Sequence, residues 1–236
     1  MPQDQSTGAP EVPTHAAPLP QRVTLKGRYV TLVPLEPGHA DALYEGAHGA
    51  GNEAVWTYLY ERPFEDRAEF AAHIAAKAAS KDPIFYAITD ARSGAVLGYQ
   101  TLMRIDAANR VIEVGNILYT RAMQRTAGAT EAQYLFARYV FEDLGYRRYE
   151  WKCNNLNAPS KRAALRFGFS FEGIFRQHMI VKGRNRDTAW YSMLDGEWPA
   201  RRRAFEAWLA PHNFDAHSQQ IKSLSGLQTS PQPPGG

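Results

Sequence analysis

Residues 126–130 place small and polar side chains directly before a strong helical pattern, in the stretch "MQRTAGATEAQYLFARYVFEDLGY". Small side chains let the backbone approach a ligand closely. The start of a helix adds free N–H groups and a partial positive charge of roughly half an elementary charge. Together these features are typical of a phosphate site. An ordinary loop followed by a helix cap would contain the same residues, so this pattern alone leaves both interpretations open.

Other motifs of reactive residues are missing from the sequence. It contains no His-Glu-x-x-His, no paired cysteines at metal-binding spacing and no Gly-x-Ser-x-Gly. Neither metal nor serine-hydrolase chemistry is therefore indicated. The single cysteine, Cys153, excludes an internal disulfide framework and fits a reducing, cytoplasmic location. Cys153 ends an apolar strand pattern, where a cysteine is usually a small buried hydrophobic residue.

Composition divides the 236 residues into three parts. Residues 1–21 are rich in Pro, Gln and Ala without apolar periodicity, and residues 212–236 run out through "SLSGLQTSPQPPGG", so we expect disordered tails at both ends. Residues 22–211 fit a single domain. No apolar run approaches the ~20 residues of a membrane span. The net charge of +3 is mild, and residues 201–203, all arginine, fit a solvated helix face. We therefore expect neither a membrane nor a nucleic-acid partner.

The hydrophobic pattern predicts an alternation of strands and helices. Strands are expected at 28–35, 83–90, 95–105, 110–120 and 147–153, followed by a hairpin of two strands around "KGRNR". Helices are expected at 39–48, 66–79, 129–144, within 157–168 and at 198–209. The fold class is thus α/β in the mixed α+β sense, with one largely antiparallel sheet. The aromatic-rich connection "NEAVWTYLYERPF" is either a pinned loop or the wall of a pocket.

Four motifs in this order resemble the GNAT superfamily of acyl-CoA-dependent N-acyltransferases, and most closely its RimJ/RimL-like branch, which acetylates N-terminal amines of ribosomal proteins. They are the loop Gln124–Ala129 followed by Thr-Glu-Ala, the Asn-x-x-Ser at 157–160, "RFGFSFEG" and "KGRNRDTAWYS" with its central Asp187. The likeness covers roughly residues 22–198. It implies a central mixed, mostly antiparallel sheet of six to seven strands, splayed in the middle, with about four helices and a C-terminal helix.

The loop departs from the family pattern in one respect. Ala127 and Ala129 stand where glycine is common, and the single Gly128 lies between them. Alanine disfavours positive φ angles, so the loop can cradle a pyrophosphate only if its torsions remain helical or extended.

The resemblance implies that acetyl-CoA lies between the strands at 110–120 and 147–153. Its pyrophosphate would sit on backbone N–H groups of the α-helix start, and its pantetheine arm would pair with the edge of the first strand. A backbone N–H near Leu118 would stabilise the oxyanion, and Arg125 could bind a phosphate or remain solvated. The implied cofactor residues are Ile117, Leu118, Tyr119, Gln124, Arg125, Thr126, Ala127, Gly128, Ala129, Thr130, Asn157 and Ser160.

Two residues are candidates for proton transfer. Glu113 lies mid-strand, on the same face as Gly115 and Ile117 by the period of two, and a carboxylate among apolar residues suits a general base acting through water. Its alternative roles are a buried ion pair with an arginine and attraction of a cationic substrate without proton transfer. The Asn-x-x-Ser resemblance makes Ser160 the candidate donor to the CoA thiolate, although serine is also common in a first helical turn. Asn157 would cap that helix and bind the pantetheine amides.

The acceptor is expected to be a primary amine. A peptide α-amine, with pKa near 8, is about one-tenth neutral at pH 7, whereas about one lysine in 2,500 is neutral. The α-amine therefore needs a general base less, and the resemblance favours a protein N-terminus. Small-molecule amines and a non-catalytic CoA-binding sensor are the alternatives. Trp56, Tyr58, Tyr60 and His178 are candidate acceptor contacts, each with packing as its other role. A homodimer is expected by analogy alone.

Overall fold

The structure, a computed structural model, describes residues 11–229. One eight-stranded sheet forms its centre, in the spatial order β1-β2-β3-β4-β5-β6-β8-β7. All neighbours are antiparallel except β5 and β6, which are parallel. The strands are β1 Leu25–Lys26, β2 Val30–Pro34, β3 Ile84–Asp90, β4 Val96–Asp106, β5 Val111–Tyr119, β6 Arg148–Asn154, β7 Ser170–Val181 and β8 Arg184–Leu194.

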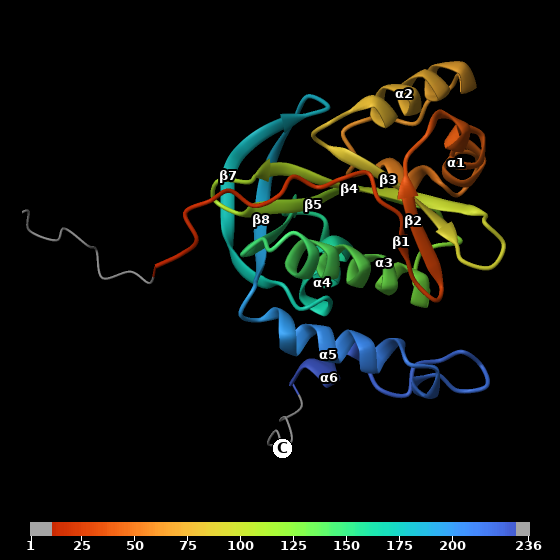
Figure 1. The fold of residues 1–236 in the computed structure, drawn as a ribbon. Helices are drawn as coiled ribbons and strands as arrows, with labels where there is room; N and C mark the ends of the chain where they lie inside the picture. The colour runs from red at the N-terminus through yellow and green to blue at the C-terminus, as the bar shows by residue number, and fades with distance from the viewer. Residues whose placement is uncertain (1–10, 230–236) are drawn as a thin grey trace, which may run out of the picture.

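Six α-helices and several short turns complete the fold (Figure 1). The α-helices are α1 Ala40–Ala47, α2 Arg67–Ala79, α3 Ala127–Arg138, α4 Ala158–Arg166, α5 Trp198–Leu209 and α6 Leu224–Thr229. The 3-10 turns are η1 Pro37–His39, η2 Glu53–Trp56 and η4 Pro211–Asn213, and a π-helical turn, η3 Tyr139–Asp143, extends α3. Within residues 11–229, no helix is long and apolar enough to cross a membrane.

This architecture confirms the predicted fold class, a mixed α/β domain with one mostly antiparallel sheet. The predicted count of six to seven strands is below the eight observed, and the two-residue β1 is too short to show a period in the sequence. The C-terminal helix α6 is also additional.

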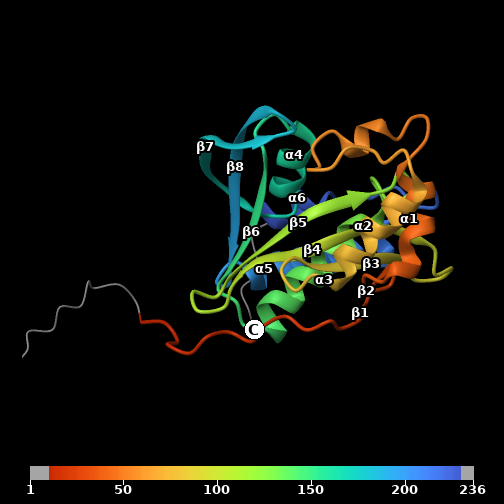
Figure 2. The same cartoon turned by 90° about the horizontal axis from the view of Figure 1, so that it is seen from above.

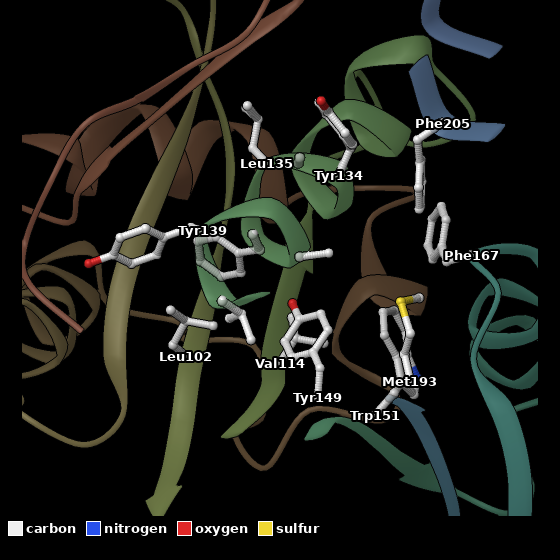
Figure 3. Close-up of a cluster of buried hydrophobic side chains, with 14 of the residues drawn as sticks. Leu102, Val114, Tyr134, Leu135, Tyr139, Tyr149, Trp151, Phe167, Met193 and Phe205 are labelled. Carbon is white, nitrogen blue, oxygen red and sulfur yellow. The ribbon is translucent and has the colours of Figure 1, made fainter. Parts of the chain in front are cut away.

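Helices cover both faces of the sheet (Figure 1). One apolar cluster lies between the sheet and α3, α4 and α5, and a second lies under α1 and α2 against β3 and β4. Figure 3 shows side chains of the first cluster: Tyr134 and Leu135 on α3 lie across from strand residues Val114, Tyr149 and Trp151. The α3 core fixes the strands that frame the candidate site.

Helix α3 is anchored to the other end of the sheet by Glu131. Its buried carboxylate accepts backbone N–H bonds from Arg28, Tyr29 and Val30 at 2.8, 2.6 and 2.8 Å. A carboxylate that receives three N–H donors is well compensated for burial. The acidic residue of the Thr-Glu-Ala motif thus holds the N-terminal half of α3 against the start of β2.

The two segments expected to be tails differ from that expectation where the structure describes them. In the N-terminal segment, Ala17 is buried and its N–H donates to the Ala107 carbonyl, while Gln21 bonds to Tyr86 and Tyr139. In the C-terminal segment, Leu224 is fully buried and α5 packs on α6. Few apolar residues anchor each segment, so no periodicity marks them. Residues 1–10 and 230–236 lie outside the described residues.

Candidate active site

Strands β5 and β6 start side by side and then separate. Their parallel register covers only Val111–Val114 and Arg148–Trp151, yet β5 continues to Tyr119 and β6 to Asn154. Beyond Val114 the two edges are no longer bonded to each other, and Figure 2 shows the strands diverging. The open edges can accept an extended ligand that completes the hydrogen bonding. This is the splay in the middle of the sheet that the family resemblance implied.

A β-bulge in β5 changes which side chains share a face. The register with β4 shifts between Tyr99↔Leu118 and Thr101↔Gly115, so β5 has one extra residue there, and Asn116 has a φ of 45°. One inserted residue reverses the alternation beyond it. Leu118 therefore packs in the α1/α2 cluster, while Ile117 packs against the α3 cluster. Glu113 shares its face with Leu118, and the predicted shared face with Ile117 is wrong.

The bulge also refines the expected oxyanion donor. The Thr120 N–H donates to the Leu97 carbonyl at 3.0 Å, and Leu118 pairs with Tyr99 two positions back in the same register. Because N–H groups alternate between the two edges of a strand, Leu118 directs its N–H toward β4. The Tyr119 N–H is then directed toward the gap. A backbone donor near Leu118 therefore remains the proposal, and the N–H of its neighbour Tyr119 has the suitable direction.

The start of α3 presents unpaired N–H groups. Thr126 is the N-cap: its hydroxyl accepts from the Ala129 N–H at 3.2 Å. The N–H groups of Ala127 and Gly128 donate to no other described residue. The only positive φ of this loop is at Arg125, with a φ of 62°. Ala127 and Ala129 are helical, so their methyl groups do not strain the loop torsions.

Gly128 meets a packing requirement of its own. A Cβ atom at this position would lie 2.8 Å from Val30 Cγ1, closer than packed carbon atoms approach. The missing side chain therefore lets α3 approach β2, which explains a small residue here without reference to a ligand. Arg125 and Gln124 are exposed, and the Gln124 amide donates to the Tyr119 carbonyl at 3.0 Å. Thr130 is buried and accepts from Arg166 Nη1 at 3.0 Å.

Helix α4 faces the end of β6. Asn157 is its N-cap and accepts from the Ser160 N–H at 3.1 Å. The Ser160 hydroxyl accepts a 3.0 Å bond from the Trp151 indole, which leaves its own proton available to another acceptor. Burial raises the pKa of the Cys153 thiol, and a hydrogen bond with Ser160 opposes this shift. Cys153 is buried, as the sequence suggested.

A chain of alternating charges occupies the other face of β5 and β6. Glu113 lies 2.9 Å from both Arg104 Nη1 and Lys152 Nζ. Lys152 also contacts Glu150 at 2.6 Å, and Arg148 joins Glu150 at 2.6 Å. The side chains of Glu113 and Lys152 are 4% and 5% exposed. Glu113 therefore has the ion pair with an arginine that the sequence left open as an alternative role.

The aromatic-rich connection 53–61 covers this charged face. Tyr58 donates to the Leu156 carbonyl at 2.9 Å, and the Lys182 ammonium donates to the Trp56 carbonyl at 2.8 Å. The segment thus bridges the β6–α4 loop and the β7–β8 hairpin. Trp56 itself is only 2% exposed and packs in the α1/α2 cluster. The Trp56 ring therefore packs in the core, which was its other predicted role, whereas Tyr58 and Tyr60 are partly exposed.

His178 lies in a second bulge, on the edge strand β7. Its Nδ1 is 3.0 Å from the Thr188 hydroxyl on β8. The bulge is held by Asp187, which accepts from the Gln177 N–H at 2.7 Å. This bond lowers the pKa of Asp187, and the Asn185 amide adds to the effect. Asp187 of the hairpin motif therefore has a defined local role.

The structure brings most of the predicted residues around the gap, from β5, the start of α3 and the start of α4. Sequence reasoning missed Lys152, Arg104 and Arg166. In "RRYEWKC" the charged residues alternate with Tyr149, Trp151 and Cys153. That period of two on an expected strand was the available signal for a charged face opposite an apolar one.

Comparison with known proteins agrees with this geometry. Residues 30–170, more than half of the chain, match the "Acetyltransferase (GNAT) domain" family. A crystal structure of a GCN5-related N-acetyltransferase from Brucella melitensis is 54% identical, with a TM-score of 0.89, over 90% of this chain and 97% of that one. The "Putative ribosomal N-acetyltransferase YdaF" of Bacillus subtilis (strain 168) is 30% identical over 105 residues. That match spans 44% of this chain and 57% of the relative.

A more distant structure shares the fold. The microcin C7 self-immunity acetyltransferase MccE, solved in complex with acetyl-CoA and AMP, is 21% identical with a TM-score of 0.62. The superposition covers 71% of this chain and 93% of MccE. With the family match, the splayed sheet and the open helix start, the chain belongs to the GNAT acetyltransferase family. It is an enzyme of the N-acetyltransferase class, and the likeness to a ribosomal N-acetyltransferase agrees with the predicted RimJ/RimL-like branch.

Proposed function

We propose that the protein transfers an acetyl group from acetyl-CoA to a primary amine, most favourably the α-amine of a protein N-terminus, within a ternary complex. One observation carries the proposal: β5 and β6 separate beyond Val114, and the helix α3 that follows β5 begins with the unpaired N–H groups of Ala127 and Gly128. An extended, phosphate-bearing cosubstrate fits both features. Acetyl-CoA would supply the activated acetyl group as a thioester.

The start of α3 would hold the pyrophosphate. The N–H groups of Ala127 and Gly128 and the positive end of the helix dipole favour an anion. Exposed Arg125 adds a charged donor. Gln124, Thr126, Ala129 and Thr130 complete the predicted loop, although the Thr126 hydroxyl and the Ala129 N–H already bond to each other. The edge of β5 from Ile117 to Tyr119 would pair with the pantetheine arm, as would Asn157 on α4.

Ser160 is proposed to hydrogen-bond the departing thiolate. Its hydroxyl accepts from the Trp151 indole, so it can donate its own proton to the anionic sulfur in place of its contact with Cys153. The indole donor also fixes the orientation of the hydroxyl.

Glu113 is proposed to take up the proton of the amine through water. Arg104 and Lys152 contact its carboxylate and hold it in place. An α-amine, already about one-tenth neutral at pH 7, makes a small demand on such a base. The lower pKa of an α-amine therefore favours it over a lysine side chain as the acceptor.

Two measurements test the proposal. Calorimetry should show acetyl-CoA binding that weakens when Arg125→Gln removes the exposed charge, by about threefold to tenfold. Thiol release with peptides bearing free N-termini should depend on the amine, and mass spectrometry should find the acetyl group on the α-nitrogen. If acetyl-CoA raises the melting temperature while no amine accelerates thiol release, the chain binds the cosubstrate as a sensor and the catalytic proposal is wrong. Acetylation confined to small-molecule amines would replace the protein acceptor.

A further inference from the structure

Arg186 on β8 is a buried cation without a carboxylate partner. The residue is 7% exposed, yet no acidic side chain within residues 11–229 lies within salt-bridge distance of it. Its Nε donates to the Thr188 hydroxyl at 3.3 Å, and its terminal nitrogens donate to no described residue. A buried guanidinium is normally paired, because removing a charge from water is costly. Arg186 therefore has the donor capacity for an anion from outside the chain.

The surroundings place Arg186 beside the charged face of the gap. Its guanidinium carbon lies 5.4 Å from the centre of the Tyr60 ring. Tyr60 in turn interacts electrostatically with Arg104, the partner of Glu113. Thr188, which holds Arg186 Nε, also contacts His178. The residues predicted for the acceptor, Tyr60 and His178, thus adjoin this arginine.

The neighbouring charges do not neutralise it. Arg104 and Lys152 share Glu113, and Lys152 and Arg148 share Glu150, so the six charges of that chain, with Glu172 as the last, balance one another. The Lys182 ammonium on the same hairpin binds a backbone carbonyl and adds a further positive charge. Among these side chains, Arg186 is therefore the buried cation that no described carboxylate contacts.

We propose that Arg186 binds an anionic group of the acceptor, a carboxylate close to the amine that is acetylated. This inference rests on the proposed function and adds a substrate class to it. A planar guanidinium with both terminal nitrogens free matches a carboxylate in bidentate geometry. The carboxylate has two possible sources: an acidic side chain near a peptide N-terminus or the α-carboxylate of a free amino acid.

The test compares acceptors that differ only in charge. One pair is a peptide with Asp or Asn at its second position, and the other is a free amino acid and its carboxamide. In at least one of the two pairs, the wild-type enzyme should have a kcat/KM tenfold or more higher for the acceptor with the carboxylate than for its neutral counterpart. The difference should lie mainly in KM. Arg186→Gln should reduce that preference to about onefold while leaving the neutral acceptor unchanged, and Arg186→Lys should restore part of it.

Arg184→Gln is the matched control, because it removes the same charge from an exposed position two residues earlier on β8. An equal loss of preference in Arg184→Gln and Arg186→Gln would indicate a diffuse field and overturn the proposal, as would a wild-type enzyme without preference. Acetyl-CoA affinity, measured by calorimetry, should be the same in all three. If no amine is acetylated, the proposed function is wrong. Calorimetric binding of the same acceptor pairs to wild type and Arg186→Gln then decides the anion subsite separately.

Discussion

The two faces of β6 show opposite ways of burying side chains. Tyr149 and Trp151 face α3 and pack among aromatic rings (Figure 3), and Cys153 belongs to the same cluster. Arg148 and Lys152 lie on the other face, in contact with carboxylates. The apolar face is stabilised by removal of carbon surface from water. The charged face must compensate each ion individually. Substitutions on one strand can therefore separate a face that carries stability from a face that sets the electrostatics of the site.

Lys152→Ala should have the largest effect on folding. The ammonium joins Glu113 and Glu150 and lies 3.8 Å from the centre of the Trp190 ring. Its loss leaves two buried carboxylates with one arginine each. Breaking a buried pair from one side costs about 3–5 kcal/mol, and the remaining arginines place the expected loss near the lower value, about 3 kcal/mol. Urea unfolding followed by tryptophan fluorescence measures it.

The control for Lys152 removes charge in a balanced way. Lys152→Met combined with Glu150→Gln leaves one carboxylate–arginine pair at Glu113 and an amide beside Arg148. This double variant should be more stable than Lys152→Ala by at least about 1 kcal/mol. Equal stability of the two would mean that lost packing of the lysine stem, and not uncompensated charge, determines the effect.

Trp151→Phe tests the apolar face of the same strand. The smaller ring leaves a cavity in the α3 cluster and should cost about 2 kcal/mol. It also removes the indole donor to Ser160, so kcat should fall more than KM changes if Ser160 acts on the leaving group. Tyr149→Phe is the matched control, since the Tyr149 hydroxyl is buried without a described partner and its removal should be neutral or stabilising. A kcat equal to wild type in Trp151→Phe would disconnect the indole from catalysis.

A third carboxylate, Glu61, contrasts with both faces because it is only partly buried. Burial by itself raises its pKa, but His73 and Lys77, at 3.2 and 2.8 Å, lower the pKa to about 2. A carboxyl group whose pKa is lower in the folded state stabilises the fold at any pH above its pKa in the unfolded chain. This contribution disappears as the pH falls from about 4.5 to about 2. Solvent screening limits the contribution to about 1–2 kcal/mol.

The measurement compares wild type with Glu61→Gln by urea unfolding at pH 6 and pH 3. Wild type should be the more stable by about 1–2 kcal/mol at pH 6, and the difference should shrink at pH 3. A difference that does not depend on pH would assign the effect of Glu61 to packing.

The sequence predicted elements well where the side-chain period was long and uninterrupted. The strands of the meander and helices α1–α5 lie within a few residues of their expected bounds. It failed at Asn116, because one bulge residue reverses every later side chain of β5 and no local pattern announces it. The candidate site could be predicted because its motifs, at the starts of α3 and α4, present backbone N–H groups and helix caps that depend on local sequence. Lys152 and Arg186 escaped because their importance depends on which charges the fold brings together from distant strands.

The smallest expected effect concerns the start of α3, where alanines replace the family's usual glycines. Ala127 and Ala129 are helical in this structure, so each methyl group limits the unfolded chain without straining the fold. Ala127→Gly and Ala129→Gly should each destabilise the protein by about 0.5–1 kcal/mol, with acetyl-CoA affinity unchanged within about twofold. Calorimetry and thermal unfolding measure the two quantities. Gly128→Ala should also lose stability, in this case because the added methyl group would contact Val30. A marked gain in affinity from either glycine would show that the alanine methyl groups obstruct the phosphate site, and that this corner is adapted for weak binding.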